Sequence, residues 1–219
     1  MRKVSGNQNG HQSHGAGNWK SSKTKATIMS ELKTWGASIR KLAPMEVFKF
    51  RDHLLRLDKE SRRNRFGGAV SNEFIENYIE LSLGLDAVIH GFFVDGILRG
   101  VAELRPLGHG FADEAEAAFS IETPWQSNGV GTALLERTLL AARNRGIKLL
   151  HMACLVNNAR MIELARKFEA ELKFDFGSVI GEVEAAHPTP MSVLREFVAD
   201  SHGFATAMLD VHSKMLRPA

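Results

Sequence analysis

Residues 126–131, with the sequence Gln-Ser-Asn-Gly-Val-Gly, have the composition of a turn that binds an anion. Gly129 and Gly131 have no side chain, so a ligand can approach the main chain closely at both positions. A helix is predicted to follow from about residue 132 to residue 145, because apolar residues recur there with helical spacing. The free amides of a helix's first turn carry partial positive charge, which suits a phosphate or pyrophosphate. An ordinary strand-turn-helix connection would use the same glycines, so the turn alone leaves both interpretations open.

Three kinds of phosphate-binding turn differ in the residues they require. A Walker-type loop needs a lysine after its last glycine, but Thr132 and Ala133 follow Gly131 here. A dinucleotide-binding turn needs a third glycine, and Leu134 occupies that position. The remaining pattern, Gln-x-x-Gly-x-Gly, resembles the signature of the GNAT superfamily of N-acetyltransferases, (Arg/Gln)-x-x-Gly-x-(Gly/Ala). The resemblance implies that this turn holds the pyrophosphate of acetyl-CoA, the cosubstrate of that superfamily.

The resemblance also implies which residues contact the coenzyme. They lie at the end of the strand before the turn, in the turn itself, and at the start of a later helix. The set is Ile121, Glu122, Thr123, Gln126, Ser127, Asn128, Gly129, Val130, Gly131, Thr132 and Asn158. Asn158 is also predicted to cap the helix that follows it, because an asparagine side chain accepts hydrogen bonds from the first amides of a helix.

Acetyl transfer to an amine requires no protein nucleophile, but the amine must lose a proton. A lysine-like amine has a reference pKa of ~10.4, and holding it neutral at pH 7 costs about 4–5 kcal/mol. A carboxylate relieves part of this cost, directly or through one water molecule. Glu116 is the candidate base, because it lies on the strand before the turn, where the similar Pat-type protein-lysine acetyltransferases have a glutamate. A solvated strand carboxylate is the plainer interpretation of Glu116, and Glu103 and Glu122 are weaker candidates.

The chain departs from the family pattern in two places, and the replacement of Gly-Phe by Glu169-Ala170 after the helix that follows Asn158 concerns only a turn. Many members have a tyrosine in the helix after Asn158 that protonates the leaving thiolate, and the pattern places Ala165 there. We therefore consider two functions. The first is an acetyl-CoA-dependent N-acetyltransferase that acts on a small molecule or a protein lysine by direct attack in a ternary complex. The second is a GNAT-fold module that binds acyl-CoA as a sensor and does not catalyse.

Other kinds of chemistry find little support in the sequence. The histidines have no recognisable ligand spacing, so we predict no metal site. Cys154, the one cysteine, lies in an apolar run and is predicted to be a buried strand thiol. A single cysteine allows no intramolecular disulfide, which favours a reducing compartment and a cytoplasmic protein. The basic N-terminal segment makes nucleic-acid binding a minor third interpretation, and we expect no specific nucleic-acid partner.

Hydrophobic patterning predicts the elements that position these residues. Strands are expected at 38–42, 88–94, 97–104, 114–121, 148–156, 172–176 and 179–184, and helices at 45–57, 71–80 and 159–168. Asp95-Gly96 between two apolar runs indicates a hairpin, and Ser71 is a suitable helix cap. This order resembles the GNAT fold, an α/β (α+β) architecture with a mixed, mostly antiparallel central sheet flanked by helices on both faces. The strands ending near Ile121 and Val156 should be parallel neighbours that part to admit the pantetheine arm.

The 219 residues divide into three predicted segments. Residues 1–34 are a polar, basic tail that we expect to be disordered. Residues 35–185 form the GNAT domain, and residues 186–219 form a helical extension interrupted near Gly203. The extension is rich in apolar residues, which should either cover the sheet or pair two subunits as a homodimer. No stretch approaches the ~18 apolar residues of a membrane span, so we expect no membrane association.

Overall fold

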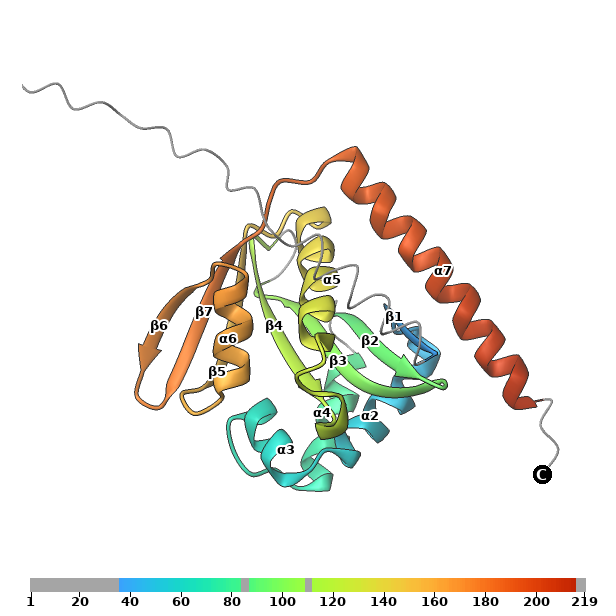
Figure 1. Ribbon diagram of the computed structural model, residues 1–219, viewed down its shortest axis with the longest axis horizontal. Coiled ribbons are helices and arrows are strands. Elements are labelled where there is room, and N and C mark those ends of the chain that lie inside the picture. The colour runs from blue at the N-terminus through green and yellow to red at the C-terminus, as the bar shows by residue number, and fades with distance from the viewer. Residues whose placement is uncertain (1–35, 84–86, 109–111, 216–219) are drawn as a thin grey trace, which may run out of the picture.

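The computed structural model describes residues 36–83, 87–108 and 112–215, and one seven-stranded sheet with the order β1-β2-β3-β4-β5-β7-β6 forms its centre (Figure 1). The strands are β1 (Ala37–Lys41), β2 (Val88–Val94), β3 (Ile97–Pro106), β4 (Glu114–Ile121), β5 (Leu149–Leu155), β6 (Glu171–Asp175) and β7 (Ser178–Glu184). The helices are α2 (Val47–Arg56), α3 (Lys59–Phe66), α4 (Asn72–Leu83), α5 (Val130–Asn144), α6 (Ala159–Lys167) and α7 (Pro190–Met215), with 3-10 turns at Pro44–Glu46 and Thr123–Trp125. Neighbouring strands are antiparallel except β4 and β5. The predicted fold class is confirmed.

The hairpin between β2 and β3 forms as its sequence predicts. Asp95 and Gly96 both adopt left-handed conformations, with φ of 50° and 72°. A two-residue turn of this kind matches the twist of the two strands it joins, so Val94 pairs directly with Ile97. The hairpin fixes β3, and β4 then pairs along β3 over its whole length.

β4 and β5 run parallel but pair only over a short stretch. Residues 114–116 of β4 are the partners of residues 149–151 of β5. Beyond that point β4 continues to Ile121 and β5 to Leu155, while β5 pairs with β7 on its other side. The two strands therefore part toward their carboxyl ends, as predicted, and the turn after β4 lies at the open end.

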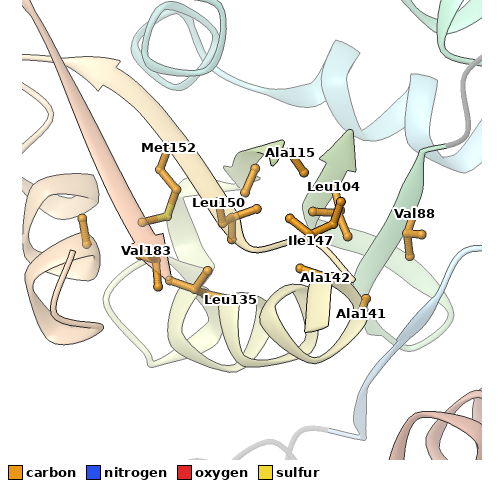
Figure 2. Packing of buried hydrophobic residues seen from close by; sticks show 12 residues of the cluster. Val88, Leu104, Ala115, Leu135, Ala141, Ala142, Ile147, Leu150, Met152 and Val183 are labelled. Atoms are coloured by element: carbon orange, nitrogen blue, oxygen red, sulfur yellow. The ribbon is translucent and has the colours of Figure 1, made fainter. Parts of the chain in front are cut away.

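Helices cover both faces of the sheet. One buried cluster joins the sheet to α5 and α6, and it includes Leu104, Leu135 and Leu150 (Figure 2). A second cluster packs α2 and α4 against the opposite face around Phe50 and Ile75. Because side chains alternate along a strand, successive residues of β4 point to different helical layers.

The helix starts differ in how their first amides are satisfied. The side chain of Asp58 accepts from the amide of Ser61 in α3, and Ser71 accepts from the first turn of α4. Asn158 caps α6 by accepting from the amide of Met161 at 3.2 Å, so both predicted caps are confirmed. By contrast, Gly129 is the N-cap of α5 and provides no side-chain acceptor. The first amides of α5 therefore lack the cap that these other helices have.

One helix prediction is wrong, and one helix was not predicted. α7 is continuous through Gly203, because the missing side chain lets the helix approach β1: a Cβ there would lie 2.7 Å from the Cβ of Arg40. α3 was not predicted, since this short helix is highly polar and has no buried residue that would mark an apolar stripe.

Several apolar side chains of the C-terminal helix α7 are exposed to solvent. Leu194, Phe197 and Val198 are about half exposed or more, so these three do not cover the sheet within one chain, whereas α7 packs against β1 at Gly203. The predicted tail, residues 1–34, lies outside the described residues. Within the described part, no helix has the length and apolar character needed to cross a membrane.

Candidate functional site

A cavity of about 410 Å³ lies where β4 and β5 part. Its walls come from α3, the end of β4, the turn after it, the first turn of α5 and one face of α6. Seven of the predicted coenzyme-contacting residues line it, namely Ile121, Gln126, Ser127, Gly129, Gly131, Thr132 and Asn158. Three separate segments of the sequence thus meet at one cavity.

The side chain of Gln126 holds the turn in position. Its Nε2 donates to the main-chain oxygen of Ile121 at 2.7 Å and lies 3.2 Å from Oγ of Ser61. These bonds tie the turn both to the end of β4 and to α3. Trp125 adds an edge-to-face contact with Phe92 of β2, with ring centroids 5.7 Å apart. The uncapped start of α5 is therefore held at the cavity wall, where its amides suit an anionic ligand.

The other four predicted residues do not line the cavity. The hydroxyl of Thr123 donates to the carboxylate of Asp58, and Nδ2 of Asn128 donates to the main-chain oxygen of Pro124 at 3.4 Å. Val130 is buried in the core. The carboxylate of Glu122, the fourth residue, belongs to an ionic cluster. A contact from these positions to a ligand would therefore come from the main chain.

The carboxylate of Glu122 ties α2 to β3 and β4. It accepts hydrogen bonds from Arg56 at 2.9 Å and Arg99 at 2.8 Å, and it lies 3.3 Å from Nδ1 of His53. Burial opposes its ionisation, but hydrogen bonds from His53, Arg99 and Arg56 lower the pKa of Glu122 to about 2. A carboxylate with so low a pKa is a poor proton acceptor, which argues against Glu122 as the base.

His53 connects this ionic cluster to the cavity wall. Its ring is fully buried, and its Nε2 lies 3.0 Å from Oγ of Ser120, a residue that lines the cavity. Burial lowers the pKa of His53 below its ordinary value, so the ring is neutral at pH 7. Sequence reasoning missed this contact because His53 and Ser120 are 67 positions apart.

Glu103, the other weaker candidate, is fully buried in a second cluster. Its carboxylate accepts hydrogen bonds from Arg65, Arg105 and Tyr78. Burial again opposes ionisation, but the two guanidinium groups lower the pKa of Glu103. Arg65 also lines the cavity, so this cluster fixes the α3 wall and leaves Glu103 without a free route to a substrate.

Glu116 lies at the last residue pair before β4 and β5 part. Its Cα partners are Arg105 on β3 and His151 on β5, and it is half-buried. Strand alternation directs it to the same face as Ser120, which contacts α2. Glu116 is not part of the cavity lining. It stands roughly 17 Å from Ile121 along the strand at ~3.3 Å per residue, so a ligand extended along β4 from the turn would end near it.

Position 165 offers no proton donor, and its methyl side chain is buried in the core with α6 and β7. Cys154 lies on β5 as predicted but is half-buried, and burial raises the pKa of its thiol. It is therefore protonated at neutral pH and a poor nucleophile. The described residues contain no group of three or more histidine, cysteine, aspartate or glutamate side chains placed to hold a metal ion.

Charged residues of α6 also line the cavity and were missed from the sequence. Arg160, Glu163 and Lys167 recur with helical spacing and share one face of the helix. An amphipathic pattern assigns such a face to solvent, which is why no ligand role was predicted. The signal that could have found it is the position of the helix, directly after a strand that borders the predicted turn.

Comparisons with known proteins agree with this architecture. A sequence model described as the acetyltransferase (GNAT) family matches residues 53–169. The GNAT domain of S. lividans PAT superposes with a TM-score of 0.59 at 24% identity, over 68% of this chain and 90% of that domain. No curated protein matches the chain.

Two solved structures with bound coenzyme share the fold. The PaiA N-acetyltransferase of Thermoplasma acidophilum, in complex with coenzyme A, has a TM-score of 0.52 and 21% identity over 68% of this chain and 98% of its own. The putative acetyltransferase yncA of Salmonella typhimurium, with its cofactor acetyl-CoA, has a TM-score of 0.52 and 16% identity over 71% of this chain and 98% of its own. At these identities the likeness is one of fold.

Proposed function

This chain belongs to the acetyltransferase (GNAT) family, and from that premise we propose that it transfers an acetyl group from acetyl-CoA to an amine. The amine is a small molecule or a protein lysine, and it attacks directly in a ternary complex. The observation that carries the proposal is the uncapped start of α5, held at the wall of a cavity between two parting strands. The coenzyme complexes of two proteins with the same fold support it.

The residues present fit a coenzyme A thioester. The first amides of α5 and the turn 126–132 would bind the pyrophosphate, because they combine unpaired donors with the positive end of the helix dipole. The pantetheine arm would run along the unpaired edge of β4, whose main chain beyond residue 116 has no β5 partner. Asn158 caps α6 and lines the cavity, so it can also contact the arm.

Glu116 is the base in this proposal, acting directly or through one water molecule. It lies on β4 at the level where the strands begin to part, on the face that carries Ser120 and α2. The amine nitrogen attacks the thioester carbon, its proton passes to Glu116, and the carbon–sulfur bond breaks to release the thiolate. A main-chain amide of β4 polarises the carbonyl oxygen, and the positioning of two bound substrates supplies much of the remaining rate.

The experiment measures release of free thiol from acetyl-CoA across a panel of amines. Replacing a positioned base typically costs about 10²–10⁴ in rate, so Glu116→Gln should lower turnover by that factor while coenzyme affinity changes little. The loss should shrink at high pH, where more amine is already neutral. Glu114→Gln is the matched control. Glu114 lies on the same strand as Glu116, and its exposed carboxylate pairs with His151. Near-parent activity of Glu116→Gln at pH 7 would show that the assignment is wrong.

Ala165 favours one alternative, a non-catalytic module that binds acyl-CoA and regulates a partner. The position at which many family members have a proton-donating tyrosine holds a buried methyl group. The same thiol assay discriminates between the two functions: coenzyme binding without turnover of any amine would favour the sensor. A cytoplasmic location is also proposed, and the single cysteine and the proposed cosubstrate are consistent with it.

A further inference from the structure

Two cations on α6 face the cavity without a carboxylate partner. Nζ of Lys167 lies 3.2 Å from Oγ1 of Thr132, and this is its one hydrogen bond to the described residues. Arg160 lines the same cavity and makes no hydrogen bond or ion pair with the part of the chain that the structure describes. Glu163 lies between them on the helix, and among the described residues it forms an ion pair with neither. The α6 wall of the cavity therefore carries net positive charge.

Each cation lies near the positive end of a helix, although Lys167 is also in the last turn of α6, where its own helix dipole favours a cation. Thr132 belongs to the first turn of α5, so the ammonium of Lys167 lies beside the positive end of that helix. Arg160 is in the first turn of α6, at the positive end of its own helix. An anion in the cavity would be attracted by both cations and by both helix starts.

We propose that these two cations divide the phosphates of the cosubstrate between them, so that the cavity selects a nucleotide thioester with a 3′-phosphate. This rests on the proposed function, because it assumes that coenzyme A occupies the cavity. Lys167 bonds the pyrophosphate, since its ammonium is already at the first turn of α5. Arg160 pairs with the 3′-phosphate of the ribose, because it is exposed at the rim of the cavity. A guanidinium matches phosphate oxygens in a bidentate geometry, which suits it to this terminal group.

The consequence is a preference among donors that share the same thioester arm. Dephospho-coenzyme A retains the pyrophosphate but lacks the group assigned to Arg160. A phosphopantetheine arm on a carrier protein lacks both the 3′-phosphate and the second phosphate of the pyrophosphate. The cavity should therefore take free acyl-CoA in preference to either donor.

The experiment measures dissociation constants of coenzyme A and dephospho-coenzyme A for the full chain by calorimetry. The parent should bind coenzyme A about 10-fold more tightly than the dephospho form, an effect expected of one charge-assisted contact at a partly exposed site. Arg160→Gln should weaken coenzyme A alone and bring that ratio close to one. Lys167→Met should weaken both ligands by a similar factor of about 10 and leave the ratio unchanged. Arg166→Gln is the control, since Arg166 is an exposed cation on the same helix outside the cavity lining.

Each contrary outcome has a distinct meaning. A parent that binds both nucleotides equally, or an Arg160→Gln variant that keeps the parent ratio, would overturn the 3′-phosphate assignment while the proposed function stands. A Lys167→Met variant with unchanged affinities would overturn the pyrophosphate assignment. Failure of the folded parent to bind either nucleotide would refute the proposed function itself. Because neither side chain is buried, the melting temperatures of the unliganded variants should stay at the parent value and verify folding.

Discussion

Replacing Gly131 by valine should block coenzyme binding without unfolding the protein. A Cβ added at Gly131 would lie 3.6 Å from side-chain carbons of Ile121 and Leu164, which is ordinary van der Waals contact. Both neighbours line the cavity, so the new side chain would project into it. Gly131 does not have the left-handed backbone that would strain another residue, and valine is slightly better than glycine in a helix. The fold should therefore tolerate a substitution that fills the binding site.

The size of the effect follows from the contacts that would be lost. A hydrogen bond to a charged group contributes about 1.5–3 kcal/mol, so losing two main-chain bonds to a phosphate costs roughly 3 kcal/mol or more. That corresponds to an affinity loss of about 100-fold. A ligand at ~100 times its dissociation constant stabilises the native state by about 2.7 kcal/mol. In a protein of this size the parent should then melt about 5–11 °C higher with ligand. For the variant at the same concentration the stabilisation falls to about 0.4 kcal/mol, or roughly 1 °C.

The assay is thermal unfolding with and without coenzyme A for the parent, Gly131→Val and Gly68→Val. Gly68 is the matched control, because a Cβ there would meet nothing within 4 Å and its backbone is not left-handed. The control should keep the full ligand-induced rise. Equal rises in the parent and in a folded Gly131→Val variant would refute the reasoning about the turn.

Three further perturbations test other parts of the structure. Burial, assisted by the charges of Arg137, Arg145 and Lys41, lowers the pKa of His90 to about 3. Below pH 6.5 the unfolded chain therefore binds a proton at His90 that the folded chain does not bind. The free energy of unfolding should accordingly fall by about 2 kcal/mol between pH 7 and pH 5. His90→Leu should remove that component in denaturant titrations, and an unchanged pH dependence would contradict it. Gly203→Ala should cost about 1–3 kcal/mol by overpacking against Arg40, whereas an unchanged melting temperature would show that α7 does not pack there. If the exposed residues of α7 pair two subunits, Phe197→Ser should halve the mass in solution, and a parent that is already monomeric would exclude this pairing.

Much of the fold could be predicted because its signals are local. The strands of the hairpin are rich in apolar residues, and Asp95-Gly96 favours a particular turn between them. The turn after β4 was recognised from six consecutive residues, and seven predicted contacts do line the cavity. The parting of β4 and β5 followed from the family resemblance of that strand-turn-helix-strand order.

The parts that could not be predicted depend on contacts between distant segments. His53 and Arg56 on α2 contact Glu122, which is 69 and 66 positions away in the sequence. No local sequence pattern predicts such a cluster. The polar helix α3 has a cap but no apolar stripe, so its sequence resembles that of a loop. Gly203 was interpreted as a break because glycine weakens helices, whereas its reason is close packing against β1.

The missing proton donor at position 165 weakens the case for catalysis less than the family pattern suggests. At pH 7 an amine with a pKa of ~10.4 must surrender a proton at a cost of about 4–5 kcal/mol, whereas a thiol with a reference pKa of ~8.5 yields its thiolate at a cost of about 2 kcal/mol. A thiolate can therefore leave without prior protonation, but the amine cannot attack while it is protonated. Deprotonation of the amine is the more costly step, and it is the step assigned to Glu116. The alanine at position 165 removes a proton donor only from the less costly step, departure of the thiolate. For this chain, the carboxylate at the point where the strands part is the better criterion for choosing between an enzyme and a sensor.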